Sequence, residues 1–182
     1  MPNKESYAYV AALDPKLEGV EVRMLEFVGM DAREFKAYRL RAIEDYTRES
    51  ILSGKWSPDT AAGLTAKMIG DLLPDGLDTE NHFLYSLMDR EVDTVVGAIW
   101  FGRIAGGGIY LFDLIVHEQY RRRGYGTEAM RRLEIIAASL GGQRILLNVF
   151  RRNRPAVALY DKLGYQTVNM LMEKELGHSD LL

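Results

Sequence analysis

The pattern of hydrophobic and polar positions along the chain has two periods, and each period predicts one kind of element. Apolar residues three and four positions apart are typical of helices that bury one face, whereas apolar or alternating runs between turn residues are typical of strands. The helical pattern is clearest over 124–140, where Ala129, Met130, Leu133 and Ile136 fall on one stripe. The predicted elements are a strand at 20–27, helices at 31–52 and 57–73, strands at 82–88, 92–103 and 109–116, a helix at 124–140, a strand at 144–150, a helix at 153–163 and a strand at 165–176.

This order of elements predicts the fold class and the domain organisation. Strands that follow one another directly are expected to pair antiparallel, and the later alternation of strand and helix is typical of parallel pairing. We therefore expect an α/β fold of the α+β type with a mixed sheet, in one domain over residues 20–182. An irregular arm is expected at 1–19. The length of 182 residues agrees with about one domain.

Composition narrows the classes of protein to which the chain can belong. Because there is no cysteine, disulfides, cysteine-ligated metals and cysteine nucleophiles are excluded. No spacing of histidines and carboxylates fits a metal site, and no apolar stretch is long enough to span a bilayer. The sequence does not open on a basic segment followed by an apolar run, so we expect a cytoplasmic protein with no membrane partner.

The formal charge of −3 is unevenly distributed along the chain. Residues 121–154 contain nine arginines and only two acids, Glu128 and Glu134, which gives this window +7 and leaves −10 for the remainder. The arginine guanidinium is suited to forked recognition of phosphate. The window is therefore either a solvated basic surface or an anion site.

The segment 116–127 favours the anion site. It joins a predicted strand to a predicted helix, and the first N–H groups of a helix have no intrahelical acceptor. The helix entry at 121–126 offers no side-chain acceptor as a cap, while Gly124 and Gly126 let the backbone bend and a ligand come close. The helix dipole and the three arginines at 121–123 favour negative charge there.

Familiar phosphate motifs fit this segment poorly. The Gly-Lys-Ser/Thr sequence of a P-loop is absent. Gly124-x-Gly126-x-x-Ala129 matches a dinucleotide-binding fingerprint, but seven residues separate it from the preceding strand, and three strands come before the unit. An NADP-dependent oxidoreductase is therefore kept only as an alternative.

Two motifs resemble those of the GCN5-related N-acetyltransferases. Arg121-x-x-Gly124-x-Gly126 after an apolar strand resembles the acetyl-CoA loop of that family. Asn-Arg-Pro-Ala-Val-Ala-Leu-Tyr-Asp-Lys-Leu-Gly-Tyr, which starts at Asn153, resembles its second signature. The resemblance covers about residues 20–176 and includes the order of elements. It is weakest over residues 1–80, the part in which this family varies most.

The resemblance implies an acetyl-CoA-dependent N-acetyltransferase, an acyltransferase that acts on a primary amine of a small molecule, a polyamine or a protein. It implies that the backbone of 115–117 runs beside the pantetheine arm and that N–H groups of 121–127 hold the pyrophosphate. The cofactor-binding residues are then Ile115, Val116, His117, Arg121, Arg122, Arg123, Gly124, Tyr125, Gly126, Thr127, Asn153 and Tyr160.

Two other classes remain as expectations to be tested. One is a non-catalytic CoA-binding or regulatory module. The other, a nucleic-acid-binding module, is disfavoured because no aromatic side chains alternate with the arginines. A homodimer through the arm or an exposed edge strand is left open.

Two residues are the candidates for catalysis, Asp113 and Tyr160. Asp113 is the only charge in the apolar run 109–116, and burial there raises the pKa of a carboxyl toward a useful value for a base. The alternative for Asp113 is an ion pair with an arginine such as Arg103. By the resemblance, Tyr160 lies near the sulfur and donates a proton or a hydrogen bond to the leaving thiolate. Its alternative is core packing. Glu80, His117 and Asp78 are weaker candidates for the base.

Overall fold

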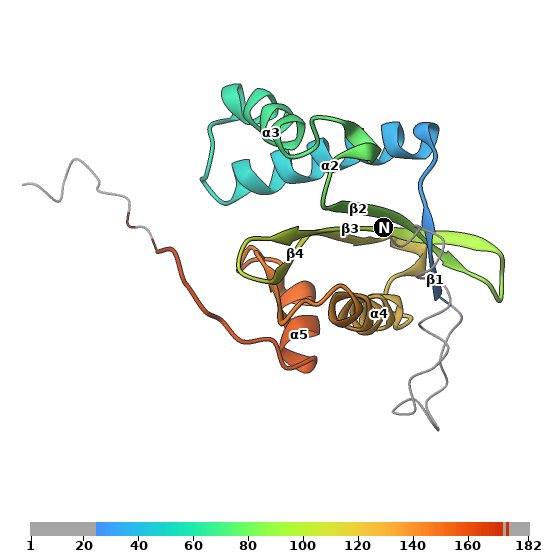
Figure 1. Ribbon diagram of the computed structural model, residues 1–182. Coiled ribbons are helices and arrows are strands. Elements are labelled where there is room, and N and C mark those ends of the chain that lie inside the picture. The colour runs from blue at the N-terminus through green and yellow to red at the C-terminus, as the bar shows by residue number, and fades with distance from the viewer. Residues whose placement is uncertain (1–24, 173, 175–182) are drawn as a thin grey trace, which may run out of the picture.

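The computed structural model describes residues 25–172 and 174, and these form three layers (Figure 1). A five-stranded sheet lies between α2 and α3 on one face and α4 and α5 on the other. The strands are β1 (Leu25–Gly29), β2 (His82–Asp89), β3 (Thr94–Ile104), β4 (Gly108–Val116) and β5 (Arg144–Leu147). The helices are α2 (Ala32–Leu52), α3 (Pro58–Leu72), α4 (Tyr125–Ser139) and α5 (Arg154–Lys162), with short 3₁₀ turns η3 (Gly76–Asp78) and η4 (Glu118–Tyr120).

The sheet is mixed, in the strand order β1-β2-β3-β4-β5. The first four strands are antiparallel to their neighbours, and β4 runs parallel to β5. This confirms the predicted mixed α/β fold. With one parallel pair among the described strands, the sheet differs from the doubly wound parallel sheet of dinucleotide-binding folds, so the topological basis of the NADP alternative is absent.

The pairing of β4 with β5 is short, and this opens the sheet. Only residues 108–111 of β4 have partners on β5, opposite 144–147. The rest of β4, residues 112–116, continues without a strand on that side in the described part of the chain. An open edge of backbone N–H and C=O groups therefore lies between β4 and the segment that follows β5.

Local sequence explains where the helix on one face begins and ends. α2 starts at a capping box in which the Glu34 N–H donates to Asp31 Oδ1 (2.7 Å) and the Asp31 N–H donates to Glu34 Oε2 (2.9 Å). After Ser53, Gly54 adopts a φ of 73°, a left-handed conformation that ends the helix. No helix of the described residues is long and apolar enough to cross a membrane.

Two hydrophobic cores lie on either side of the sheet. The first, between the sheet and α4, contains Phe101 and the predicted stripe of the helix, in which Leu133 and Met130 are fully buried. The second, between the sheet and the α2–α3 pair, contains Tyr38 and Trp100. The helical period of the sequence therefore identified the buried face of α4 correctly.

The predictions for the last strands were partly wrong. The strand expected at 144–150 ends at Leu147, and residues 165–172 form no strand. Val168 is 83% exposed and Leu171 is 97% exposed. An apolar run becomes a strand only where a neighbour takes its backbone hydrogen bonds, and the described residues place no strand beside it. The arm expected at 1–19 and the start of the first strand lie outside the described residues.

The close approach of β3 to β4 at Gly97 predicts a specific effect on stability. A Cβ at Gly97 would lie 2.1 Å from the Ile115 carbonyl oxygen. Gly97→Ala is therefore expected to lower the free energy of unfolding by about 2 kcal/mol or more, since backbone must move. Gly29→Ala is the matched control, because a Cβ there has no atom within 4 Å. Urea denaturation measures both, and equal losses would contradict the steric explanation.

Candidate active site

The predicted anion loop lies between the end of β4 and the start of α4 (Figure 1). His117 follows β4 and donates its backbone N–H to the Val96 carbonyl at 2.8 Å, which ties the start of the loop to β3. Gly124 is the N-cap of α4 and has a φ of 89°, where a side chain would be strained. Arg122 also adopts a left-handed backbone conformation, with a φ of 61°. Uncommon backbone conformations of this kind gather at ligand-binding sites.

The N-terminus of α4 has the donors that an anion needs. No side chain caps the helix, because the cap residue is Gly124. The first intrahelical hydrogen bond runs from the Glu128 N–H to the Gly124 carbonyl at 3.1 Å. The preceding N–H groups, including those of Gly126 and Thr127, therefore have no acceptor within the helix. Together with the helix dipole, this arrangement suits a phosphate oxygen.

Side chains of the loop have structural contacts of their own. Arg121 donates from Nε to the Val116 carbonyl at 3.0 Å, and the Arg123 guanidinium lies 5.9 Å from the centre of the Tyr120 ring. The Tyr125 side chain is buried, and its hydroxyl donates to Asp89 Oδ2 at 2.5 Å. Tyr125 can therefore serve a ligand only through its backbone.

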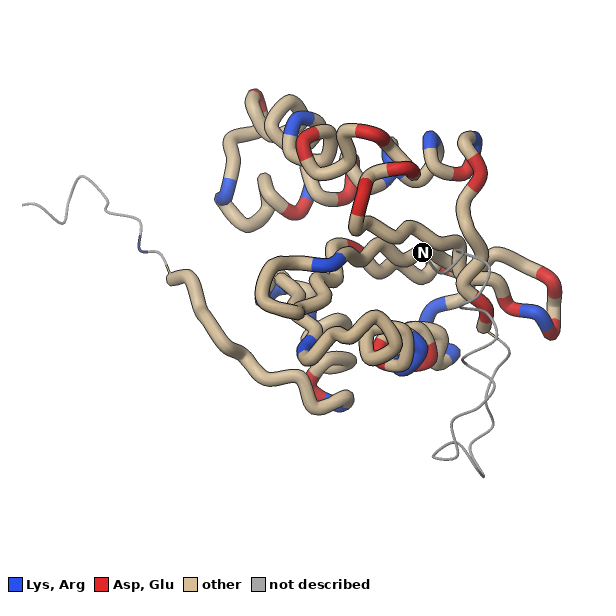
Figure 2. Tube along the Cα trace, in the orientation of Figure 1, with Lys and Arg blue, Asp and Glu red and all other residues tan. Residues whose placement is uncertain are grey.

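The basic window 121–154 does not form one surface. Arg132 on α4 pairs with Glu128 at 2.8 Å, and Arg152 pairs with Glu49 of α2 at 3.2 Å. Figure 2 shows the basic positions of the window spread over α4 and the segments on either side of it. The charge of +7 therefore overstates the charge at the loop, because only three of the nine arginines, at 121–123, lie in the loop.

The first glycine-rich motif and the second signature meet in space. A Cβ on Gly126 would lie 3.2 Å from Leu159 Cδ2 of α5, so glycine lets α4 and α5 approach closely. Asn153 is the N-cap of α5, and its side chain accepts a hydrogen bond from the Ala156 N–H at 3.3 Å. This capping bond is a structural role for Asn153, and its contact with a cofactor stays a prediction.

A β-bulge in β4 determines the direction of Asp113. Trp100 of β3 lies opposite Asp113 and Phe101 lies opposite Leu111, so Phe112 is an extra residue in β4. Strict alternation would put Asp113 on the α4 face with Leu111, which packs in the α4 core. Instead its carboxylate contacts α2, on the other face. Bulges of this kind re-aim side chains beside active sites.

The contact across that face is a hydrogen bond from the Tyr38 hydroxyl to Asp113 Oδ2 at 3.0 Å. Burial raises the pKa of Asp113 to about 6, against the lowering effects of the Tyr38 hydrogen bond and the nearby Arg41 charge. The predicted alternative, an ion pair with Arg103, is not formed, because the Arg103 guanidinium instead lies 3.4 Å from the Leu140 carbonyl.

Tyr160 on α5 lies near the Tyr38–Asp113 contact. It is half-buried and packs against the α4 core, with its ring centre 5.7 Å from that of Tyr165. Burial, and then the charge of Asp113, raise the pKa of Tyr160 to about 12. The two predicted catalytic residues therefore come from different elements and are close enough to interact electrostatically. Core packing, the alternative for Tyr160, is present as well.

The structure adds residues that sequence reasoning missed and separates others from the site. Tyr38, Arg41 and Asp45 face Asp113 from α2. The available signal was the helical spacing of Tyr38, Arg41 and Asp45, which places polar side chains on one face of α2. Asp78 and Glu80 are exposed between α3 and β2, and neither is among the charges that shift the pKa of Asp113. The described residues contain no group of three or more potential metal ligands.

Comparison with known proteins agrees with this geometry. Residues 40–165 match the model of the Acetyltransferase (GNAT) family. YycN of Bacillus subtilis, named an uncharacterized N-acetyltransferase, is 33% identical over 150 residues, which cover 81% of this chain and 96% of YycN. The crystal structure of YycN has a TM-score of 0.80 and 32% identity, and covers 85% of this chain and 99% of that one.

A shorter similarity extends to a protein whose acceptor is named. The thialysine N-epsilon-acetyltransferase of Mus musculus is 37% identical over 67 residues, which cover 37% of this chain and 37% of that protein. YdgE of Bacillus subtilis, also named an N-acetyltransferase, is 30% identical over 152 residues and covers 81% of this chain and 95% of its own. The chain therefore belongs to the GNAT family of acetyltransferases and is, like these relatives, an N-acetyltransferase.

Proposed function

We propose that this N-acetyltransferase takes the acetyl group from acetyl-CoA and transfers it to a primary amine, with Asp113 as the general base and Tyr160 as a hydrogen-bond donor to the leaving sulfur. The observation that carries the proposal is the position of the Tyr38–Asp113 pair, where β4 leaves β5 and close to Tyr160. The acetyl donor supplies a thioester whose carbonyl carbon an amine can attack.

The residues present fit the donor. The first N–H groups of α4 and the left-handed Gly124 suit a pyrophosphate, and a Cβ at Gly124 has no atom within 4 Å, so a ligand can come close. The open edge at 112–116 leaves the β4 backbone groups that point away from β3, such as the Val116 N–H, available to an extended arm of amides. These features support the predicted roles of Val116 and of the N–H groups at the start of α4, whereas the N–H groups of His117 and Arg121 are donated to Val96 and Glu118.

Asp113 has the properties of a base for the acceptor amine. An alkylammonium with a pKa of ~10.4 is only about 0.04% neutral at pH 7, so its proton must be removed. The raised pKa of Asp113, about 6 against an ordinary 3.8, makes that transfer about 3 kcal/mol less unfavourable. Tyr38 holds the carboxylate in place through its hydroxyl, and a water can relay the proton.

Tyr160 acts by hydrogen bonding rather than by full proton transfer. Its pKa of about 12 lies ~3.5 units above that of an ordinary thiol, so complete transfer would be uphill by about 5 kcal/mol. A phenol that stays protonated can still stabilise the charge that develops on the sulfur.

The acceptor is an amine of a small molecule, a polyamine or a protein, and the thialysine acetyltransferase relative supports a side-chain amine.

The donor is tested by ligand stabilisation. Acetyl-CoA at 100 times its Kd should stabilise the fold by about 2.7 kcal/mol, whereas NADPH should have no effect. Gly124→Ala should weaken the response to acetyl-CoA. Gly141→Ala is the matched control at the other end of α4, since both glycines have positive φ and open space around a Cβ. No change in Tm with millimolar acetyl-CoA or CoA would contradict the donor. A shift without CoA release from any amine would indicate a binding module.

The base is tested by the pH dependence of kcat/KM. Because the carboxylate form accepts the proton, the rate should rise with pH through about 6. Asp113→Asn should remove this rise. Tyr38→Phe should move it to higher pH, because the lost hydrogen bond had lowered the pKa of Asp113. If the rise persists in Asp113→Asn, another group is the base.

The role of Tyr160 is tested by removing its hydroxyl. Tyr160→Phe should lower kcat at least tenfold and leave the KM for acetyl-CoA within about twofold, since the hydrogen bond strengthens only as the sulfur leaves. Tyr165→Phe, which changes the neighbouring ring in the same way, should keep kcat. An unchanged kcat in Tyr160→Phe would leave Tyr160 with core packing alone.

A further inference from the structure

We propose that a pocket between α2 and the segment joining β5 to α5 binds an anionic group, a carboxylate or a phosphate, of the acceptor. This inference rests on the proposed function and narrows its acceptor. The acceptor is then an elongated molecule, such as a peptide, with the reacting amine at one end and an anionic group several residues away.

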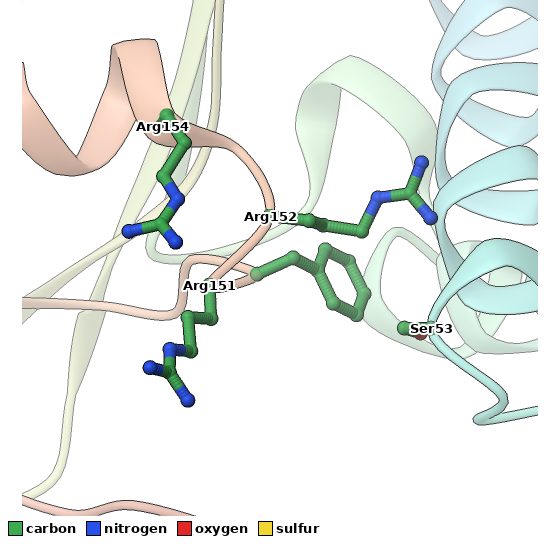
Figure 3. Close-up of a pocket in the computed structure, with 5 residues that line it drawn as sticks. Ser53, Arg151, Arg152 and Arg154 are labelled. Carbon is green, nitrogen blue, oxygen red and sulfur yellow. The ribbon is translucent and has the colours of Figure 1, made fainter.

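The pocket has a volume of about 350 Å³ and is lined by Ser53, Phe150, Arg151, Arg152 and Arg154 (Figure 3). Ser53 is the C-cap of α2, and the other four residues precede or begin α5. This volume lies within the range of small-ligand sites. It would hold the side chain of an acidic residue or a phosphate group together with part of the chain that carries it.

In the described part of the chain, the unpaired positive charge of the pocket lies on the side away from α2. Arg152 extends toward α2 and pairs there with Glu49 at 3.2 Å (Figure 3). Arg151 and Arg154 line the part of the pocket away from α2, and no carboxylate of the described residues lies within ion-pair distance of either. Each guanidinium offers forked donors that an anion can accept.

The wall of the pocket is held by aromatic packing. The Phe150 ring centre lies 5.9 Å from that of Tyr46 on α2, and Tyr46 lies 5.9 Å from Trp56. The Lys55 Nζ donates to the Tyr46 hydroxyl at 2.8 Å and lies 4.7 Å from the centre of the Trp56 ring. These contacts fix the segment against α2, so the arginines are presented from a preorganised surface.

The position of the pocket favours the acceptor over the acetyl donor. The pocket shares α2 with the Tyr38–Asp113 contact, whereas the pyrophosphate loop precedes α4 on the opposite face of the sheet. Along α2, Tyr38 and Glu49 are separated by about 16 Å, at 1.5 Å per residue. An extended peptide of about five residues spans that distance, at ~3.4 Å per residue, and a single amino acid does not.

The test compares acceptors that differ in one charge. One pair of C-terminally amidated pentapeptides has a free N-terminal amine, four alanines, and Glu or Gln at position five. The second pair is lysine and lysinamide. Release of CoA from acetyl-CoA measures kcat/KM. The wild-type enzyme should prefer the Glu peptide at least tenfold and show no such preference within the lysine pair.

Substitutions of the arginines test whether the preference for the Glu peptide arises in this pocket. Arg151→Gln with Arg154→Gln should reduce the Glu preference to about twofold or less and leave the rate with the Gln peptide unchanged. Arg144→Gln, at an exposed arginine of β5, is the control and should keep the preference. Equal rates with the two peptides in the wild-type enzyme, or a preference that survives the double variant, would overturn the inference.

A final comparison shows whether the bound anion belongs to the acceptor or to the acetyl donor. It also shows whether a negative result contradicts this inference or the proposed function. If the double variant raises the KM for acetyl-CoA and not for acetyl-dephospho-CoA, the pocket holds the 3′-phosphate of the donor and the inference is wrong. CoA release from both peptides without a Glu preference would overturn the inference and leave the proposed function standing. No CoA release from any amine would overturn the proposed function itself.

Discussion

β4 has one residue more than its partner β3 at the point where Trp100 and Phe101 face it, and the candidate site is arranged around that bulge. The extra residue, Phe112, directly follows the last β4 residue that pairs with β5. It turns Asp113 away from the α4 core and toward Tyr38. One irregularity in the backbone therefore lies at the start of the open β4 edge and directs a carboxylate toward α2.

Asp113 and Tyr160 lie near each other, but their surroundings differ and so do the effects on their pKa values. Asp113 is partly buried, with one hydrogen bond from Tyr38, and burial raises its pKa to about 6. Tyr160 is held in the α4 core, and its pKa rises to about 12. In the proposed reaction, the carboxyl that titrates near neutrality accepts the proton of the amine, and the phenol that stays protonated donates a hydrogen bond to the leaving sulfur.

Much of the fold follows from local patterns. The bounds of the helices and the stripe that includes Leu133 are each predicted from a few neighbouring positions, and the structure places the helices within about one residue of the predicted bounds. The run 165–172 shows the limit of that reasoning. Its apolar residues are typical of a strand, but pairing depends on an edge that the pattern does not describe.

The sequence by itself determined the order of elements as far as α5, the uncapped start of α4 and the two motifs, because helix periodicity, capping and glycine conformation depend on residues close together in the chain. Only the tertiary structure decided that Asp113 faces Tyr38, 75 positions away, and not Arg103. It also divided the arginines between a loop, an ion pair with Glu49 and a pocket. A bulge and the approach of α2 are set by packing between distant segments, and that packing has no local signature.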